Sequence, residues 1–183
     1  RTVTGVQTCA LPISLDESAY LTVIRSKTAK LFEASTRIAA VICQQNAEVE
    51  QACASYGQAL GTAFQVIDDV LDYDGDATLM GKNLGDDLRE GKATLPLIVA
   101  MQRGNDAERT LIATAIEQGD VTALGSIADI VRQTGAMQAT REAASAQAQR
   151  AIDALQPLPE GDHKSALYTL AEQLLARSEE HTS

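Results

Sequence analysis

The sequence predicts an all-α protein, built as a bundle of long antiparallel helices. Hydrophobic residues make up 45% of the 183-residue chain and aromatic residues only 3%. A core must therefore be built from Ala, Leu, Ile and Val, which suit packed helices. Apolar residues recur at intervals of three and four over long stretches, which is the spacing of one helix face. The sequence contains no alternating run that would indicate a β-hairpin.

The two ends of the chain are predicted to lie outside the folded domain. The stretches VTGVQTCALPI (3–13) and RSEEHTS (177–183) both resemble translated arms of a sequencing adapter. Such residues do not contribute to a native fold. An ordinary flexible tail is the alternative interpretation. We expect residues 1–13 and 177–183 to be tails and residues 14–176 to form the native part, which is one domain's worth of chain.

A first long helix is predicted to begin at Ser14, which has capping-box spacing to Glu17, and to run towards Gln45. Its inward positions are expected to be Leu21, Ile24, Thr28, Leu31 and Ile38.

A second long helix is predicted over residues 46–73. Its apolar stripe follows spacings of three and four: Val49, Cys53, Tyr56, Leu60, Phe64, Ile67 and Leu71. Gly57 and Gly61 lie one turn apart on this helix, which would allow close contact with a neighbouring helix at some cost in helix propensity.

The remainder of the chain is predicted to form a loop followed by shorter helices. Residues 75–91 contain four glycines and many charged residues, which is typical of a loop. Thr94 and Pro96 then stand where a helix cap and an early helical residue belong. Further helices are predicted at 96–103, 106–118, 121–134, 136–155 and 161–176.

The charge of the chain excludes two classes of function. Its net charge is −10, whereas nucleic-acid binding and membrane-surface helices both require basic patches. No run of 18 apolar residues occurs, so no transmembrane segment is predicted. Outside the suspected tails, Cys43 and Cys53 show neither Cys-x-x-Cys spacing nor nearby clustered histidines. We expect them to be buried small residues in a reducing, cytoplasmic protein.

An acidic cluster stands at the end of the second predicted helix. Gln65, Asp68, Asp69 and Asp72 fall within an arc of about 100°, so that three carboxylates and an amide share one face. Like charges at this spacing raise one another's pKa unless a cation lies among them. Hard oxygen ligands suit Mg²⁺, which completes its shell with water and phosphate. A solvated acidic helix end is the alternative interpretation.

Two other metal sites are disfavoured. Asp72, Asp74 and Asp76 imitate the first ligands of an EF-hand loop, but its glycine position is Ala77 and its bidentate Glu position is Asn83. A di-iron carboxylate bundle needs Glu and Glu-x-x-His motifs on several helices, and the chain has only two histidines.

Four motifs, in order, resemble those of the trans-polyprenyl diphosphate synthases. GTAFQVIDDVLD (61–72) resembles the second aspartate-rich motif of this family. Three more stretches, RSKTAKLFEAS (25–35), GKNLGDD (81–87) and EGKATLPLI (90–98), resemble its Lys-Thr helix, its glycine-lysine loop and the start of its next helix. The later helices resemble the family only in character. The motifs are most similar to bacterial long-chain, octaprenyl-type members that make quinone side chains.

This resemblance implies a fold and a reaction. The fold would be the isoprenoid-synthase helix bundle without its N-terminal helices, so that residues 14–176 form the C-terminal part of the domain. The partners would be an allylic diphosphate, which ionises with the help of Mg²⁺, and isopentenyl diphosphate, which attacks the carbocation. A homodimer is expected of a full-length member.

The resemblance also implies roles for individual residues. Asp68 and Asp72 would hold Mg²⁺, and Asp69 would join them through water or a hydrogen bond. Lys27 and Thr28 would contact the allylic diphosphate in a pocket shared with Gln65, and Lys82 would be a second counter-charge. Catalysis would depend on Lys27, Asp68 and Asp72. The alternatives are a surface lysine at 27, a packing threonine at 28 and a solvated loop lysine at 82.

Two other functions stay open. A class I terpene cyclase is also an α-helical, Mg²⁺-dependent diphosphate enzyme, but its second metal motif is usually of Asn-Ser/Thr-Glu type. A non-catalytic subunit of a heteromeric synthase would often have lost these aspartates.

The family's first aspartate motif and its isopentenyl diphosphate site would lie upstream and are not in the chain. We therefore expect the chain alone to be inactive.

Overall fold

The computed structural model describes residues 16–74 and 85–179, and within these ranges it contains helices and no strand. The elements are α1 (Glu17–Ile24), η1 (Arg25–Ala29), α2 (Lys30–Ile42), α3 (Ala47–Asp74), α5 (Asp86–Arg89), α6 (Leu95–Arg103), α7 (Asp106–Gln118), η2 (Val121–Ala123), α8 (Leu124–Gln133), α9 (Ala136–Ala154) and α10 (Asp162–Glu179). Segment η1 is a π-helix and η2 a 3₁₀-helix. The predicted all-α fold is confirmed.

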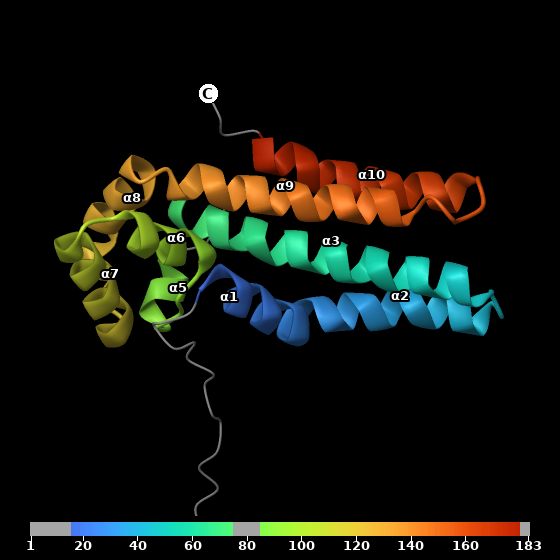
Figure 1. Cartoon of the computed structure of the whole chain (residues 1–183), viewed down its shortest axis with the longest axis horizontal. Coiled ribbons are helices and arrows are strands. Elements are labelled where there is room, and N and C mark those ends of the chain that lie inside the picture. Colours follow the sequence, from blue (N-terminus) through green and yellow to red (C-terminus); the bar gives the residue numbers. More distant parts are fainter. Residues whose placement is uncertain (1–15, 75–84, 180–183) are drawn as a thin grey trace, which may run out of the picture.

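Helix α3 is the centre of the molecule. It packs against α2 on one side and α9 on the other, and α10 lies against α9 and the same central helix. Consecutive long helices run in opposite directions, and the short helices α5–α8 gather at the end of α3 that carries the aspartates (Figure 1). Buried apolar side chains from these elements form the main core, among them Val66, Leu88, Ile98, Ile112 and Ile127.

Local signals explain why the later helices were predicted to within a few residues. Asn105 and Glu108 form a reciprocal capping box at the start of α7. The same helix ends at Gly119, which has a left-handed conformation with φ of 62°. Helix α10 continues through Glu179, three residues past the predicted boundary of the native part. The other suspected tail, residues 1–13, lies outside the described residues.

The start of the first helix differs from the prediction. Helix α1 begins at Glu17, and its N-cap is Asp16, whose Oδ1 accepts the Ala19 N–H at 2.7 Å. Ser14, the predicted cap, lies outside the described residues. The chain then continues through the π-helical segment η1 into α2, which ends at Ile42.

The π-helical segment changes which side chains of α2 face inward, so part of the predicted inward face is wrong. A π turn holds one more residue than an α turn, so the buried face passes from Ile24 to Ala29 and then to Ala40. Leu31 and Ile38, expected inward, are 72% and 58% exposed. The register shift therefore leaves an apolar surface on the outer face of α2.

The predicted close contact at the glycines is confirmed. A Cβ atom added at Gly57 would lie 2.3 Å from Thr36 Oγ1 and 2.5 Å from the Phe32 carbonyl oxygen. One added at Gly61 would lie 2.9 Å from the Cα of Ala29. The missing side chains thus let the backbones of α2, η1 and α3 approach each other, which places the Lys-Thr segment next to α3.

We expect Gly57→Ala to lower the free energy of unfolding by about 1–3 kcal/mol because the new methyl group overpacks a backbone contact. The free energy lost through overpacking should exceed the gain of about 1 kcal/mol that alanine brings over glycine in helix propensity. Gly125→Ala is the matched control, since nothing lies within 4 Å of its added Cβ in α8, and it should be neutral or stabilising. Urea denaturation of the full-length protein measures both changes. Equal stabilisation by the two alanines would contradict the contact.

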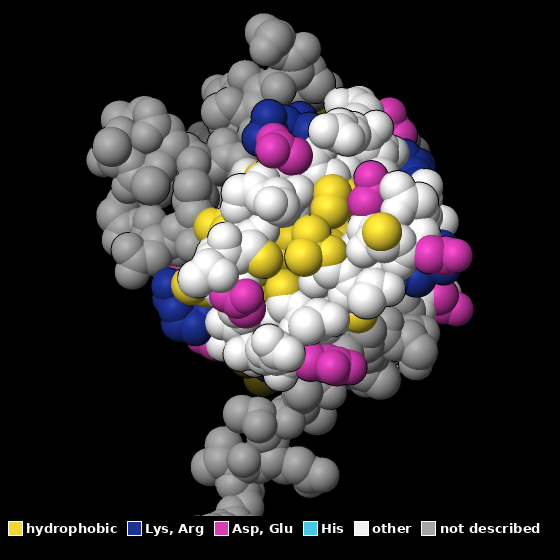
Figure 2. Space-filling model, turned by 90° about the vertical axis from the view of Figure 1, so that its left-hand side faces the viewer, with side chains coloured by type: hydrophobic (Ala, Val, Ile, Leu, Met, Phe, Trp, Pro, Cys, Tyr) yellow, Lys and Arg dark blue, Asp and Glu magenta, His cyan; other side chains and the backbone are white. Residues whose placement is uncertain are grey.

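Several surface expectations can be compared with the structure. None of the helices in residues 16–74 and 85–179 has the length and apolar character needed to cross a membrane. On the face shown in Figure 2, acidic and basic side chains of the described residues surround a small apolar area without forming an extended basic patch.

Cys43 was expected to be buried, but it is exposed because it follows the end of α2, whereas Cys53 is half-buried; both are free thiols.

Candidate functional site

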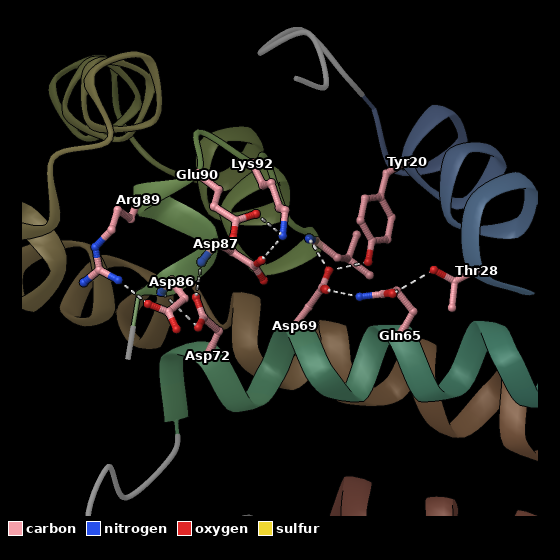
Figure 3. Close-up of polar contacts among 11 residues, drawn as sticks. Tyr20, Thr28, Gln65, Asp69, Asp72, Asp86, Asp87, Arg89, Glu90 and Lys92 are labelled. Atoms are coloured by element: carbon pink, nitrogen blue, oxygen red, sulfur yellow. Dashed lines mark hydrogen bonds and ion pairs between the residues drawn. The ribbon is translucent and has the colours of Figure 1, made fainter. Parts of the chain in front are cut away.

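The predicted carboxylate face of α3 is directed towards α1, η1 and the segment 85–95 (Figure 3). A cavity of about 110 Å³ lies between these elements. Its polar wall includes Tyr20, Lys27, Thr28, Gln65, Asp69, Asp87, Lys92 and Thr94. The structure thus brings together Lys27, Thr28, Gln65 and Asp69, which come from two helices. Asp68 and Asp72 are not part of the wall of this cavity.

Asp69 lies at the centre of a buried hydrogen-bond network and is only 2% exposed. Its Oδ2 accepts the Tyr20 hydroxyl and, at 3.4 Å, the Leu95 N–H. Its Oδ1 accepts from Gln65 Nε2 at 3.2 Å. Burial raises the pKa of Asp69 to about 7, although the hydrogen bonds from Tyr20 and Gln65 oppose the rise. The carboxylate is therefore enclosed by protein donors.

Gln65 connects this network to the Lys-Thr segment. The Thr28 hydroxyl donates to Gln65 Oε1 at 3.0 Å, and both side chains are half-buried. Lys27, the preceding residue, lies in η1 and is exposed, but it lines the same cavity. The π-helical turn thus places an ammonium group and a hydroxyl at one cavity wall, opposite the amide and the carboxylate of α3.

Asp72 connects the end of α3 to the start of α5 through hydrogen bonds. Its Oδ1 and Oδ2 accept the backbone N–H groups of Asp86 and Asp87, each at 3.2 Å, at the start of the short helix α5. Gly85 precedes that helix with φ of 80°, a conformation that favours glycine. Partial burial and the nearby charge of Asp87 raise the pKa of Asp72 to about 6. Asp72 therefore holds the returning chain against the end of α3.

Asp68 is half-buried and lies one turn before Asp72 on the same face of α3. Within the described part of the chain, no group of three or more His, Cys, Asp or Glu side chains could hold a metal ion. Asp68 and Asp72 offer oxygen donors, which Mg²⁺ prefers. They fit one side of a magnesium site whose other ligands would be phosphate oxygens, waters or further residues. Lys82 lies outside the described residues.

The sequence gives only weak signals for two residues of this site. Lys92 donates to Asp87 at 2.8 Å and to Glu90 at 2.7 Å, and it lines the cavity. Its signal was its place in the motif EGKATLPLI. Tyr20, which is 2% exposed, was overlooked. Its signal was its position four residues before Ile24 and seven before Lys27, on one helix face.

Comparison with known proteins identifies the family of the chain. The family model described as Polyprenyl synthetase matches residues 6–134. Octaprenyl diphosphate synthase from Haemophilus influenzae is 45% identical over 156 residues, which cover 85% of this chain and 47% of the relative. The Escherichia coli octaprenyl diphosphate synthase is 44% identical over 158 residues, covering 86% and 49%. The chain therefore spans about half the length of these curated relatives.

Solved structures show the same fold. A decaprenyl diphosphate synthase from Rhodobacter capsulatus superposes with a TM-score of 0.85 at 39% identity, covering 93% of this chain and 53% of that one. A polyprenyl synthase from Caulobacter crescentus, complexed with calcium and isoprenyl diphosphate, superposes with a TM-score of 0.83 at 37% identity, covering 92% and 52%. On its motifs, its fold and these relatives, the chain belongs to the polyprenyl synthetase family.

Proposed function

We propose that the protein containing this chain is a trans-prenyltransferase that adds isopentenyl diphosphate units to an allylic diphosphate. Its product would be a long-chain polyprenyl diphosphate for quinone side chains. The observation that carries the proposal is the convergence of Lys27, Thr28 and Gln65 on one cavity beside the aspartate face of α3. The named activities of the octaprenyl relatives support the choice of reaction.

The described residues suggest how the site handles a diphosphate. Asp68 and Asp72 would hold Mg²⁺, which when bound supplies Lewis-acid stabilisation of the departing diphosphate. The ammonium groups of Lys27 and Lys92 flank the cavity and would offset the negative charge of the same group. Thr28 and Gln65 form the polar wall between them. The Caulobacter protein is complexed with calcium and isoprenyl diphosphate, which supports a divalent cation and this substrate class.

The protein as a whole is part of the same proposal. Residues 14–176 would be the C-terminal part of the synthase domain, with adapter-derived residues on either side. A homodimer and a cytoplasmic location are proposed, the latter supported by the free thiols of Cys43 and Cys53. Intact aspartates disfavour a non-catalytic subunit, and the chain-elongating relatives disfavour a terpene cyclase.

The test is an elongation assay on the full-length protein. Labelled isopentenyl diphosphate, farnesyl diphosphate and Mg²⁺ should yield extractable linear polyprenyl chains, and removal of the metal by a chelator should abolish the product. Cyclic hydrocarbons without incorporated label would identify a cyclase instead. A full-length protein that binds Mg²⁺ with pyrophosphate but incorporates no label would overturn the proposed reaction.

A further inference from the structure

We propose that Tyr20 and Asp69 are positioning residues, a buried pair that fixes which hydrogen-bonding atoms of Gln65 and Thr28 face the cavity. The inference rests on the proposed function because the groups that it orients belong to the proposed diphosphate pocket. It also gives Asp69 a task different from the metal binding expected from the sequence.

The three neighbours of the Asp69 carboxylate are all hydrogen-bond donors. They are the Tyr20 hydroxyl from α1, the Leu95 N–H at the start of α6 and the Gln65 amide nitrogen from its own helix. An ionised carboxylate is acceptor-only and matches such a set. The contacts leave Asp69 2% exposed, so its oxygens are directed to protein groups, and it ties three elements together.

The orientation of Gln65 follows from this carboxylate. Because Asp69 Oδ1 accepts, the nitrogen end of the Gln65 amide must face it, and the oxygen end Oε1 is left for Thr28. The Thr28 hydroxyl then gives its only proton to Gln65. Thr28 and Gln65 thus hold each other in one arrangement at the wall of the cavity.

The same pair anchors the π-helical turn. Tyr20 in α1 is held to α3 through Asp69, and Thr28 in η1 is held to it through Gln65, so the chain is held to α3 before and after Lys27. A π turn inside a longer helix is uncommon and often occurs at functional sites. Loss of the Tyr20 hydroxyl would leave Asp69 Oδ2 with only the long Leu95 N–H contact of 3.4 Å. The carboxylate would then be held less firmly, and so would the Gln65 and Thr28 side chains that depend on it.

A pair of matched substitutions tests the proposal in the full-length protein. Tyr20→Phe and Tyr56→Phe each remove one buried phenol hydroxyl from a side chain that is at most 2% exposed. Tyr56 donates to the Leu167 carbonyl at 2.9 Å, away from the cavity. Both should lower Tm by about 2–4 °C. Only Tyr20→Phe should lower kcat, about tenfold or more, with KM for isopentenyl diphosphate unchanged within about twofold. Equal kcat for the two variants would overturn the positioning role.

A second measurement separates positioning from metal binding without using activity. Mn²⁺ binding in the presence of inorganic pyrophosphate, followed by electron paramagnetic resonance, should be unchanged in Asp69→Asn and weakened about tenfold or more in Asp68→Asn. A comparable loss of Mn²⁺ affinity in Asp69→Asn would show that Asp69 is a metal ligand and overturn its assignment.

A failure of the proposed function can be distinguished from a failure of the positioning role. If the wild-type protein does not elongate, the reaction assignment is wrong, and crystal structures decide the positioning role. The Thr28–Gln65 contact of 3.0 Å should be lost or rearranged in Tyr20→Phe and kept in Tyr56→Phe. An unchanged contact in Tyr20→Phe would refute the pair's positioning role whatever the reaction.

Discussion

Replacement of Asp68 by alanine is expected to lower kcat of the full-length protein by about a thousandfold or more. The change removes an oxygen donor from the proposed magnesium site, and the charge stabilisation supplied there acts mainly in the transition state. Asp68 is half-buried and lies on the face of α3 that also carries Asp72. Steady-state rates at saturating substrates and Mg²⁺ measure the effect, and near-normal turnover would refute the assignment.

A control is needed because any lost carboxylate changes the charge and stability of the protein. Asp129 in α8 lies at the surface, where it pairs with Arg132 at 2.8 Å. An exposed pair of this kind contributes about 0–1 kcal/mol. Asp129→Ala should therefore leave kcat unchanged and lower Tm at most slightly. Equal kcat losses in the two variants would point to a general effect of net charge rather than to a metal ligand at Asp68.

The second large effect is expected for the 183-residue chain by itself: no elongation. The chain contains one DDxxD motif, in residues 68–72, whereas the resemblance to the family implies a second, opposed set of carboxylates for the ionisation step. The resemblance also implies an isopentenyl diphosphate site formed by residues that are not among the 183, so the proximity and orientation of the nucleophile are expected to be lost as well. Incorporation of labelled isopentenyl diphosphate into extractable lipid measures the activity. Elongation above background would overturn this expectation.

The surface of the chain adds a prediction about its stability. The outer face of α2 carries Leu31, Ile38, Val41 and Ile42, all more than half exposed. A groove of about 580 Å³ beside it is lined by apolar side chains of α2, α3 and α10, among them Phe32, Leu60, Phe64 and Leu170. At about 25 cal/mol per Å², leaving a few hundred Å² of apolar surface in water forgoes several kcal/mol, which rivals the net stability of a domain.

We therefore expect the isolated chain to be loose or to associate through this surface. Thermal unfolding followed by circular dichroism, together with sedimentation, checks the expectation. The full-length protein is the control, and it should melt sharply. A cooperative transition of a monomeric 183-residue chain would show that the exposed face needs no cover.

The sequence by itself determined the fold class and most helix boundaries. These follow from local chemistry: apolar residues at helical spacing, the capping box at Asn105 and the left-handed glycines at 119 and 135. It also placed Gln65 and the three aspartates on one helix face, since the pitch of a helix fixes their directions. The motifs around Lys27 and Gln65 indicated the family before any contact was known.

Only the tertiary structure decided how these residues are used. Tyr20 and Asp69 are 49 positions apart, and no local pattern links them; packing of α1 against α3 does. The π-helical turn, which packs against α3, moves the buried position from the predicted Thr28 to Ala29. Asp72 accepts the first N–H groups of α5 because tertiary packing brings that helix back to the end of α3. A helical period fixes the direction of a side chain, but its partner is fixed only when distant segments pack together.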